Sequence, residues 1–139
     1  MVPLLPWMRR LLYFAAIYNL LAGFTMTVLY HEVYMTFGWT KPERMLFTQL
    51  VGILVALFGV GYWMVAREPV ENRNVLLLGF LSKLLGSVLG LGYVASGKLS
   101  LLFFITLIFS DIVYLPFFAV ILRRLYAIAA ERRRWSDST

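Results

Sequence analysis

Long apolar runs separated by short polar or turn-forming stretches dominate the pattern along this chain. Four windows are continuously apolar over about 20 positions, the length that a helix needs to cross roughly 30 Å of hydrocarbon. They span residues 11–30, 45–66, 75–95 and 101–122. The runs do not alternate as the strands of a membrane barrel would. The pattern therefore predicts an all-α integral membrane four-helix bundle, with residues 1–139 forming a single transmembrane domain.

Turn-forming residues set how the windows connect. The Thr-Lys-Pro-Glu motif at 40–43 has the form of a capping box with proline in the first turn, which predicts a helix start just before the second window. Pro69 ends that helix, because proline cannot continue the hydrogen-bond ladder. The Ser-Gly-Lys sequence at 96–98 predicts a tight turn, so the windows form two antiparallel hairpins. The longest connection, 31–39, has room for a small ordered element.

Composition supports this class and excludes several kinds of site. Hydrophobic residues make up 61% of the chain and charged residues 14%, whereas soluble domains contain about 45–50% and about 25%. Without cysteine, disulfides, thiolate metal sites, iron–sulfur clusters and thiol redox chemistry are excluded. The single histidine, His31, beside Glu32, is expected to be an exposed interfacial residue, because a metal site needs three or more convergent ligands. No metal is expected.

Basic residues are distributed unevenly between the two sides of the predicted bundle. Nine fall on the side of the N-terminus, the second connection and the tail, and three fall on the other side. The nine are Arg9, Arg10, Arg67, Arg73, Arg123, Arg124, Arg132, Arg133 and Arg134, and the three are Lys41, Arg44 and Lys98. By the positive-inside rule, both termini are cytoplasmic.

The segment 123–139 is then a basic cytoplasmic tail that continues the last helix along the anionic leaflet. Each arginine near the membrane surface adds about 1 kcal/mol of attraction to anionic lipids. Because topology accounts for these arginines, no nucleic-acid partner is expected.

Charged residues inside the windows are the sharpest candidates for chemistry. Lys83 lies fifteen residues before Lys98 in the third turn, and Asp111 lies thirteen residues after it. At about 1.5 Å per residue, both reach nearly the same level near the bilayer midplane. A charge in hydrocarbon costs about 2.5–3.5 kcal/mol, so such residues pair or face a cavity. The spacing predicts a Lys83–Asp111 ion pair.

Other polar residues are expected around this pair. Asn19 comes to about the same level, and Tyr18 and Tyr114 are further candidates for the polar centre. Asn19 and Gln49 are expected to form interhelical hydrogen bonds, and small residues on the same faces predict close helix contacts. These faces carry Ala15, Asn19 and Gly23; Gln49, Gly52, Ala56 and Gly59; and Gly79, Lys83, Gly86 and Gly90.

The role of the Lys83–Asp111 pair is open, and a nearby proline adds to the alternatives. Pro116 lacks a backbone donor and predicts a kink close to Asp111, which opens a cavity or relieves packing. The pair itself either fixes helix register as a neutralised structural contact or serves as a proton site or an anchor for a polar headgroup.

Several motifs together resemble a known group of proteins. They are Tyr18-Asn19 with Gly23, Gln49-Leu50-Val51-Gly52, Gly59-Val60-Gly61-Tyr62, Arg67-Glu68-Pro69 with Asn72-Arg73, and Gly79 with Lys83 and Gly86. Over most of residues 9–122 the chain resembles the DoxX-like family of small four-helix bacterial membrane proteins. The resemblance implies the bacterial inner membrane, and some members resemble small subunits of quinone-linked oxidoreductases or associate with redox partners. No catalytic residue is carried over, and thiol-based roles do not transfer to a chain without cysteine.

Three function hypotheses follow. Small size and glycine-lined faces favour a non-catalytic accessory or assembly subunit of a membrane, redox-linked complex, with a membrane protein partner or a homodimer. The alternative is a small transporter or a lipid- or quinone-binding protein, with Lys83 and Asp111 at the site and Asn19 orienting the ligand. An enzyme is a third option, limited to proton transfer by one lysine, one aspartate and tyrosines. A dry centre favours the subunit, whereas a cavity reaching Lys83 favours the binder.

Overall fold

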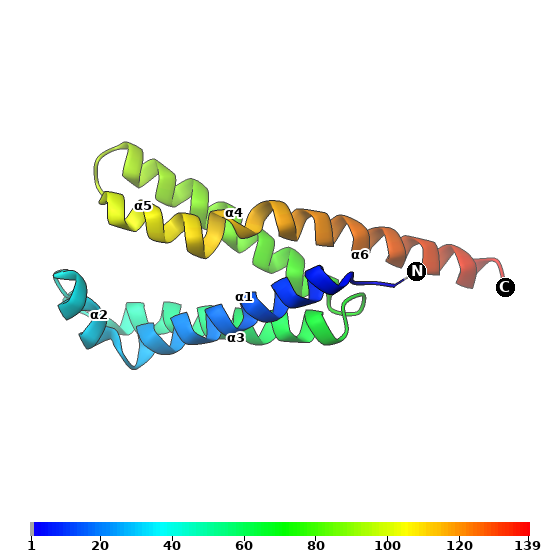
Figure 1. Ribbon diagram of the computed structural model, residues 1–139, viewed down its shortest axis with the longest axis horizontal. Coiled ribbons are helices and arrows are strands. Elements are labelled where there is room, and N and C mark those ends of the chain that lie inside the picture. Colours follow the sequence, from blue (N-terminus) through cyan, green and yellow to red (C-terminus); the bar gives the residue numbers. More distant parts are fainter. Residues whose placement is uncertain (1) are drawn as a thin grey trace.

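The computed structural model describes residues 2–139, which are mostly helical and contain no strand, so the all-α prediction is confirmed (Figure 1). The helices are α1 (Pro6–Thr27), α2 (Tyr30–Phe37), α3 (Met45–Arg67), α4 (Arg73–Ala95), α5 (Leu101–Leu107), the π-helix η1 (Ile108–Ile112) and α6 (Tyr114–Asp137).

Three helical segments are long and apolar enough to cross a membrane: α3, α4 and the stretch Leu101–Asp137 that contains α5, η1 and α6. Helices α1 and α2 pass the same test only as a pair, and they meet at an angle of 87°. The chain is therefore a multi-pass membrane protein. The first window, predicted at 11–30, corresponds to a helix that begins at Pro6, ends at Thr27 and is followed by a sharp bend.

The first connection contains the small ordered element that the sequence allowed for, but it lacks the predicted helix cap. Residues 31–37 lie in the short helix α2, which ends at Phe37 and is followed by Gly38 with the left-handed φ of 65° that glycine adopts without strain. The capping-box prediction was wrong, because α3 begins at Met45 and no side chain caps it. The motif at 40–43 lies in the connection instead, where Lys41 Nζ contacts His31 Nδ1 and links this segment to α2.

The other two connections follow the predictions. Helix α3 ends at Arg67, directly before Glu68 and Pro69. The turn at 96–98 contains Gly97 with a φ of 73°, a conformation that needs glycine. This turn reverses the chain between α4 and α5 (Figure 1).

Small residues bring α1 and α3 into backbone contact, as predicted. A Cβ atom added at Gly23 would lie 2.4 Å from the Gly52 carbonyl oxygen, and one at Gly59 would lie 2.8 Å from the Ala16 carbonyl oxygen. Neither distance leaves room for a side chain, so α1 and α3 form one tightly packed pair.

The predicted face of α4 is only partly right. Gly79 packs on the Tyr62 ring and Gly90 packs on Leu107, but a Cβ atom at Gly86 would meet nothing within 4 Å. The buried residue in that turn is Ser87, one position further along. One residue rotates a helix by about 100°, which places Gly86 on the outer surface.

The hydrophobic core lies at the end of the molecule that holds both termini and the connection 68–72, which we call the closed half (Figure 1). Its fully buried side chains include Leu12, Val65, Phe118, Ile121 and Leu125.

Polar contacts join the elements of the closed half. The Arg124 guanidinium donates to the carbonyl oxygens of Val2 (2.7 Å) and Pro3 (3.1 Å). The Tyr126 hydroxyl donates to Asn74 Oδ1 (2.5 Å). The predicted tail is helical to Asp137, and its first turns belong to the core.

The opposite end, which holds α2 and the turn at 96–98, is the open half. Here the α1–α3 pair and the α4–α5 hairpin diverge (Figure 1). Leu107 is the one buried residue of α5, whereas α6 has seven.

Candidate functional site

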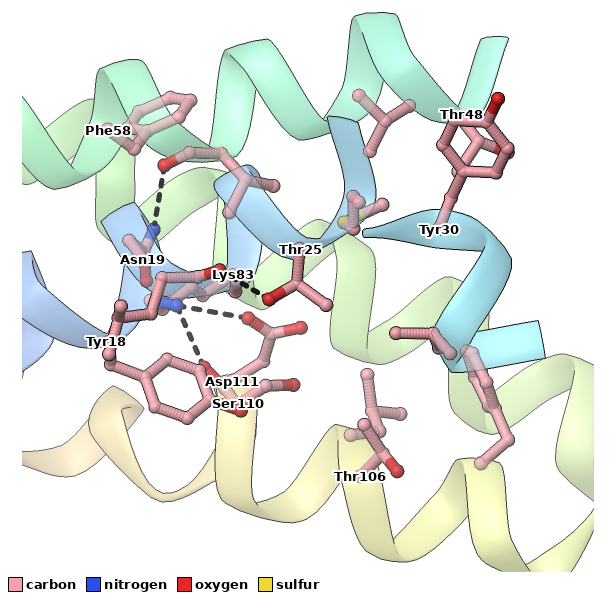
Figure 2. A pocket seen from close by; sticks show the side chains of 18 of the residues that line it. Tyr18, Asn19, Thr25, Tyr30, Thr48, Phe58, Lys83, Thr106, Ser110 and Asp111 are labelled. Carbon is pink, nitrogen blue, oxygen red and sulfur yellow. Dashed lines mark hydrogen bonds and ion pairs between the residues drawn. The ribbon is translucent and has the colours of Figure 1, made fainter. Parts of the chain in front are cut away.

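A cavity of about 730 Å³ separates the two helix pairs in the open half (Figure 2). Side chains from α1, α2, α3, α4, α5 and η1 line it. Most of them are apolar or aromatic, including Phe58 and Phe103, and Trp39 lies at the level of α2. Pockets of roughly 300–1,000 Å³ with mostly apolar walls are typical of sites for small molecules and cofactors.

The predicted ion pair forms the polar end of this cavity. Lys83 Nζ on α4 lies 3.0 Å from Asp111 Oδ1 on η1 and also donates to the Ser110 carbonyl oxygen at 2.8 Å. The Lys83 side chain is 6% exposed and the Asp111 side chain 28%. The ammonium therefore lies on the packed side of the pair, and the carboxylate faces the cavity.

Two aromatic rings cover the buried ammonium. Lys83 Nζ lies 5.0 Å from the centre of the Tyr114 ring and 5.9 Å from the centre of the Tyr62 ring. Both distances fall within the range at which a ring attracts a cation. The Tyr18 ring lies 6.3 Å from that of Tyr114, so both predicted tyrosines belong to the polar centre.

Tyr62 is a site residue that sequence reasoning missed. Its ring occupies the space that the missing side chain of Gly79 leaves on α4. One sequence feature could have pointed to Tyr62. It lies on the same face of its helix as Gly59, a small residue at a predicted helix contact, and its side chain carries a hydroxyl.

The irregular turn beside the charge is a π-helix. The Val113 N–H donates to the Ile108 carbonyl oxygen, five residues earlier, at 2.9 Å. The Ser110 carbonyl that accepts from Lys83 lies within this turn. Residues 101–137 continue as one helical segment through the π-helical turn, which ends at Ile112, four residues before Pro116. The kink predicted from Pro116 stays a prediction. Such π-helical turns are frequent at functional sites.

Asn19 and Gln49 both form the interhelical hydrogen bonds that were predicted, but only one lines the cavity. Asn19 Nδ2 donates to the Val55 carbonyl oxygen at 3.3 Å, beside the Lys83–Asp111 pair (Figure 2). Gln49 Nε2 donates to the Thr27 carbonyl oxygen at 3.2 Å and lies outside the cavity lining.

The cavity is also lined by three threonines that the sequence reasoning missed, Thr25, Thr48 and Thr106, and two of them hydrogen-bond within their own helices. Thr25 Oγ1 donates to the Leu21 carbonyl oxygen (2.8 Å) and Thr106 Oγ1 to that of Leu102 (2.9 Å). Each hydroxyl hydrogen is used within its own helix, so what these two threonines offer to the cavity is oxygen lone pairs. A threonine inside an apolar window is the sequence feature that could have pointed to these residues. Whether its side chain faces a cavity depends on how the helix pairs diverge, which the sequence does not give.

The described residues contain no group of three or more histidine, aspartate or glutamate side chains that could hold a metal ion. Comparison with known protein families, with curated proteins and with solved structures found no match for this chain. The DoxX-like resemblance stays a prediction.

Proposed function

We propose that this protein binds an amphipathic small molecule, a membrane lipid or a quinone, in the cavity of the open half. The polar head of the ligand lies at the Lys83–Asp111 pair and its apolar part lies along the aromatic walls. The observation that supports this proposal is a cavity of about 730 Å³ that ends on a buried ion pair. Polar groups within a transmembrane segment mark functional sites by default when they face a cavity.

The orientation in the membrane is part of the proposal. With α1 and α2 taken as the first span, the bundle has four spans with both termini in the cytoplasm of a bacterial inner membrane. The closed half then carries the nine basic residues and faces the anionic leaflet. Helix α2 turns away from α1 at 87°, and Trp39 stacks on Phe37 with ring centres 4.8 Å apart. Because tryptophan is enriched at membrane–water interfaces, Trp39 supports placing this end of the bundle at the interface opposite the cytoplasm.

Binding is favoured over transport because the cavity lies in one half only. Beyond the pair, the fully or nearly fully buried Tyr62, Tyr114 and Phe118 fill the space between the helices. A transport pathway would have to pass through this packed core. The arrangement instead provides one apolar chamber with a polar end.

The accessory-subunit hypothesis uses another surface of the same molecule. Gly86 and Gly92 on α4 have open space where a side chain would be, so a partner helix could approach this face closely. The cavity at Lys83 favours binding as the primary function, and a partner on α4 would leave that cavity free.

Native mass spectrometry of protein gently extracted from its own membrane tests the proposal. We expect the chain to carry an adduct with the mass of a lipid or quinone. Thr106→Trp places an indole in the cavity and should abolish the adduct. Its matched control is Ile105→Trp, because Ile105 is the preceding residue, is 43% exposed and does not line the cavity.

Three outcomes contradict the proposal. A chain without any adduct overturns ligand binding, and an adduct that survives Thr106→Trp places the ligand elsewhere. A heteromeric complex without a small-molecule adduct instead supports the accessory subunit.

A further inference from the structure

The polar end of the cavity combines an accessible carboxylate with a shielded ammonium. Lys83 Nζ donates to Asp111 and to the Ser110 carbonyl oxygen, the Tyr114 ring covers it, and the whole Lys83 side chain is only 6% exposed. An ammonium has three N–H groups, and the packing leaves little access to the third. The strongest cation of the site is thus shielded from a ligand.

Several groups that face the cavity present oxygen lone pairs, and the hydroxyls of Tyr18 and Ser110, which can donate or accept, line it as well. Asp111 uses Oδ1 for Lys83, and a carboxylate accepts at two oxygens, so Oδ2 is left for a ligand. Thr25 and Thr106 have donated their hydroxyl hydrogens to their own helices. Asn19 donates through Nδ2 to α3, which leaves its Oδ1 as an acceptor. The ligand group that matches the accessible carboxylate of Asp111 is a hydrogen-bond donor.

The charge of the pair restricts the ligand further. An anionic headgroup would approach the Asp111 carboxylate first, with the compensating Lys83 ammonium behind it. A cationic headgroup would compete with Lys83 for a carboxylate oxygen that already has a partner 3.0 Å away. An uncharged donor leaves the ion pair intact and still gains a hydrogen bond to a charged acceptor, one of the stronger kinds in proteins.

We infer that the cavity selects an uncharged amphiphile whose headgroup carries a free hydroxyl, and that this hydroxyl donates to Asp111. The inference rests on the proposed function, because it names the ligand class of the same cavity. A diacylglycerol and a hydroquinone with an apolar tail share this chemistry. An oxidised quinone offers carbonyl acceptors alone and binds more weakly.

A set of probes with matched tails tests the inference on wild-type protein, purified in detergent and freed of lipid. The glycerol series is 1,2-dioctanoylglycerol, its 3-O-methyl ether and dioctanoyl phosphatidic acid. The quinone series is a decyl hydroquinone and the corresponding quinone. Occupancy at several probe concentrations gives the affinity of each by native mass spectrometry.

We expect the hydroxyl-bearing member of at least one series to bind about ten-fold more tightly than its partner without a donor, the ratio expected for one hydrogen bond to a charged group. The series that shows this preference identifies the ligand as a glyceride or as a hydroquinone. Equal affinity with and without the hydroxyl, or tightest binding by phosphatidic acid, overturns the headgroup inference and leaves cavity binding in place. No binding by any probe overturns the inference together with the proposed function.

A double variant assigns the preference to the pair. Lys83→Met with Asp111→Leu keeps the apolar walls and removes the charges, so the ten-fold preference should disappear while the probes still bind. The matched control is Arg132→Met with Glu71→Leu, which removes the exposed 3.5 Å ion pair of the closed half and should retain the preference. A preference that persists in the first variant places the hydroxyl away from Asp111 and overturns the inference.

Discussion

The closed and open halves are built from continuous helices, yet they pack differently. In the closed half, α6 fills the space between the helix pairs with Phe118, Ile121 and Leu125, all fully buried. In the open half, the corresponding part of the same span, α5, buries Leu107 alone and leaves a cavity. The contact between α1 and α3 is tight in both halves. The cavity therefore comes from the divergence of the two helix pairs, while each pair stays packed.

The Lys83–Asp111 pair marks the boundary between the two halves. Tyr62 and Tyr114 cover the lysine on the packed side, and the aspartate faces the cavity. Because of this asymmetry, removing the aspartate and removing the lysine should lower the stability of the protein by different amounts.

The largest expected effect comes from Asp111→Leu, which leaves Lys83 buried without a counter-ion. We expect a loss of about 3–5 kcal/mol in the free energy of unfolding, as for other broken buried pairs. Lys83→Met should cost less, because the remaining Asp111 is 28% exposed to the cavity. The double variant should recover much of the loss. Unfolding in detergent, followed by circular dichroism, measures the three values, and equal stability of single and double variants would show that the pair is not coupled.

A second expected effect separates the cores of the two halves. Phe118→Ala should lower the free energy of unfolding by about 3 kcal/mol, because it empties a fully buried site. Phe103→Ala removes the same ring from the cavity wall and should cost much less, since this ring is only partly buried. The same unfolding assay compares them. Similar losses for both would mean that the open half is as well packed as the closed half.

A smaller effect tests whether the helices α1 and α3 remain tightly packed against each other in the open half. Gly23→Ala forces a methyl group against the Gly52 carbonyl and should cost about 1–3 kcal/mol through overpacking. Gly86→Ala, on the open face of α4, should instead be neutral or stabilise by up to about 1 kcal/mol, because alanine lowers the entropy of the unfolded chain. A tolerated Gly23→Ala would contradict a tight α1–α3 contact in the open half.

The sequence predicted those features that depend on distance along one helix or on one turn. Counting residues from the turn at 96–98 placed Lys83 and Asp111 at one level, and their ion pair is confirmed. Pro69 and Gly97 marked connections correctly, because each limits the local backbone. The N-in/C-in topology stays a prediction.

Features that depend on packing between distant segments could not be predicted in this way. The cavity arises from side-chain volumes on helices that are far apart in sequence, and Tyr62 joins the site because Gly79 leaves space for its ring. The capping motif at 40–43 fits a local rule, but the contact between Lys41 and His31 places it in a connection. The π-helical turn at 108–112 likewise carries no distinctive residue pattern.

That turn makes the number of residues in this segment as important as their identity. A π-helical turn contains one residue more than the α-helical turn it replaces. The extra residue is taken up within the turn, so removing one residue between 108 and 112 would restore a regular helix and leave the faces of α5 and α6 nearly in register. The deletion would instead change the turn that carries Ser110 and Asp111, the two residues that Lys83 contacts. The additional residue therefore serves the placement of the polar site and not that of the core.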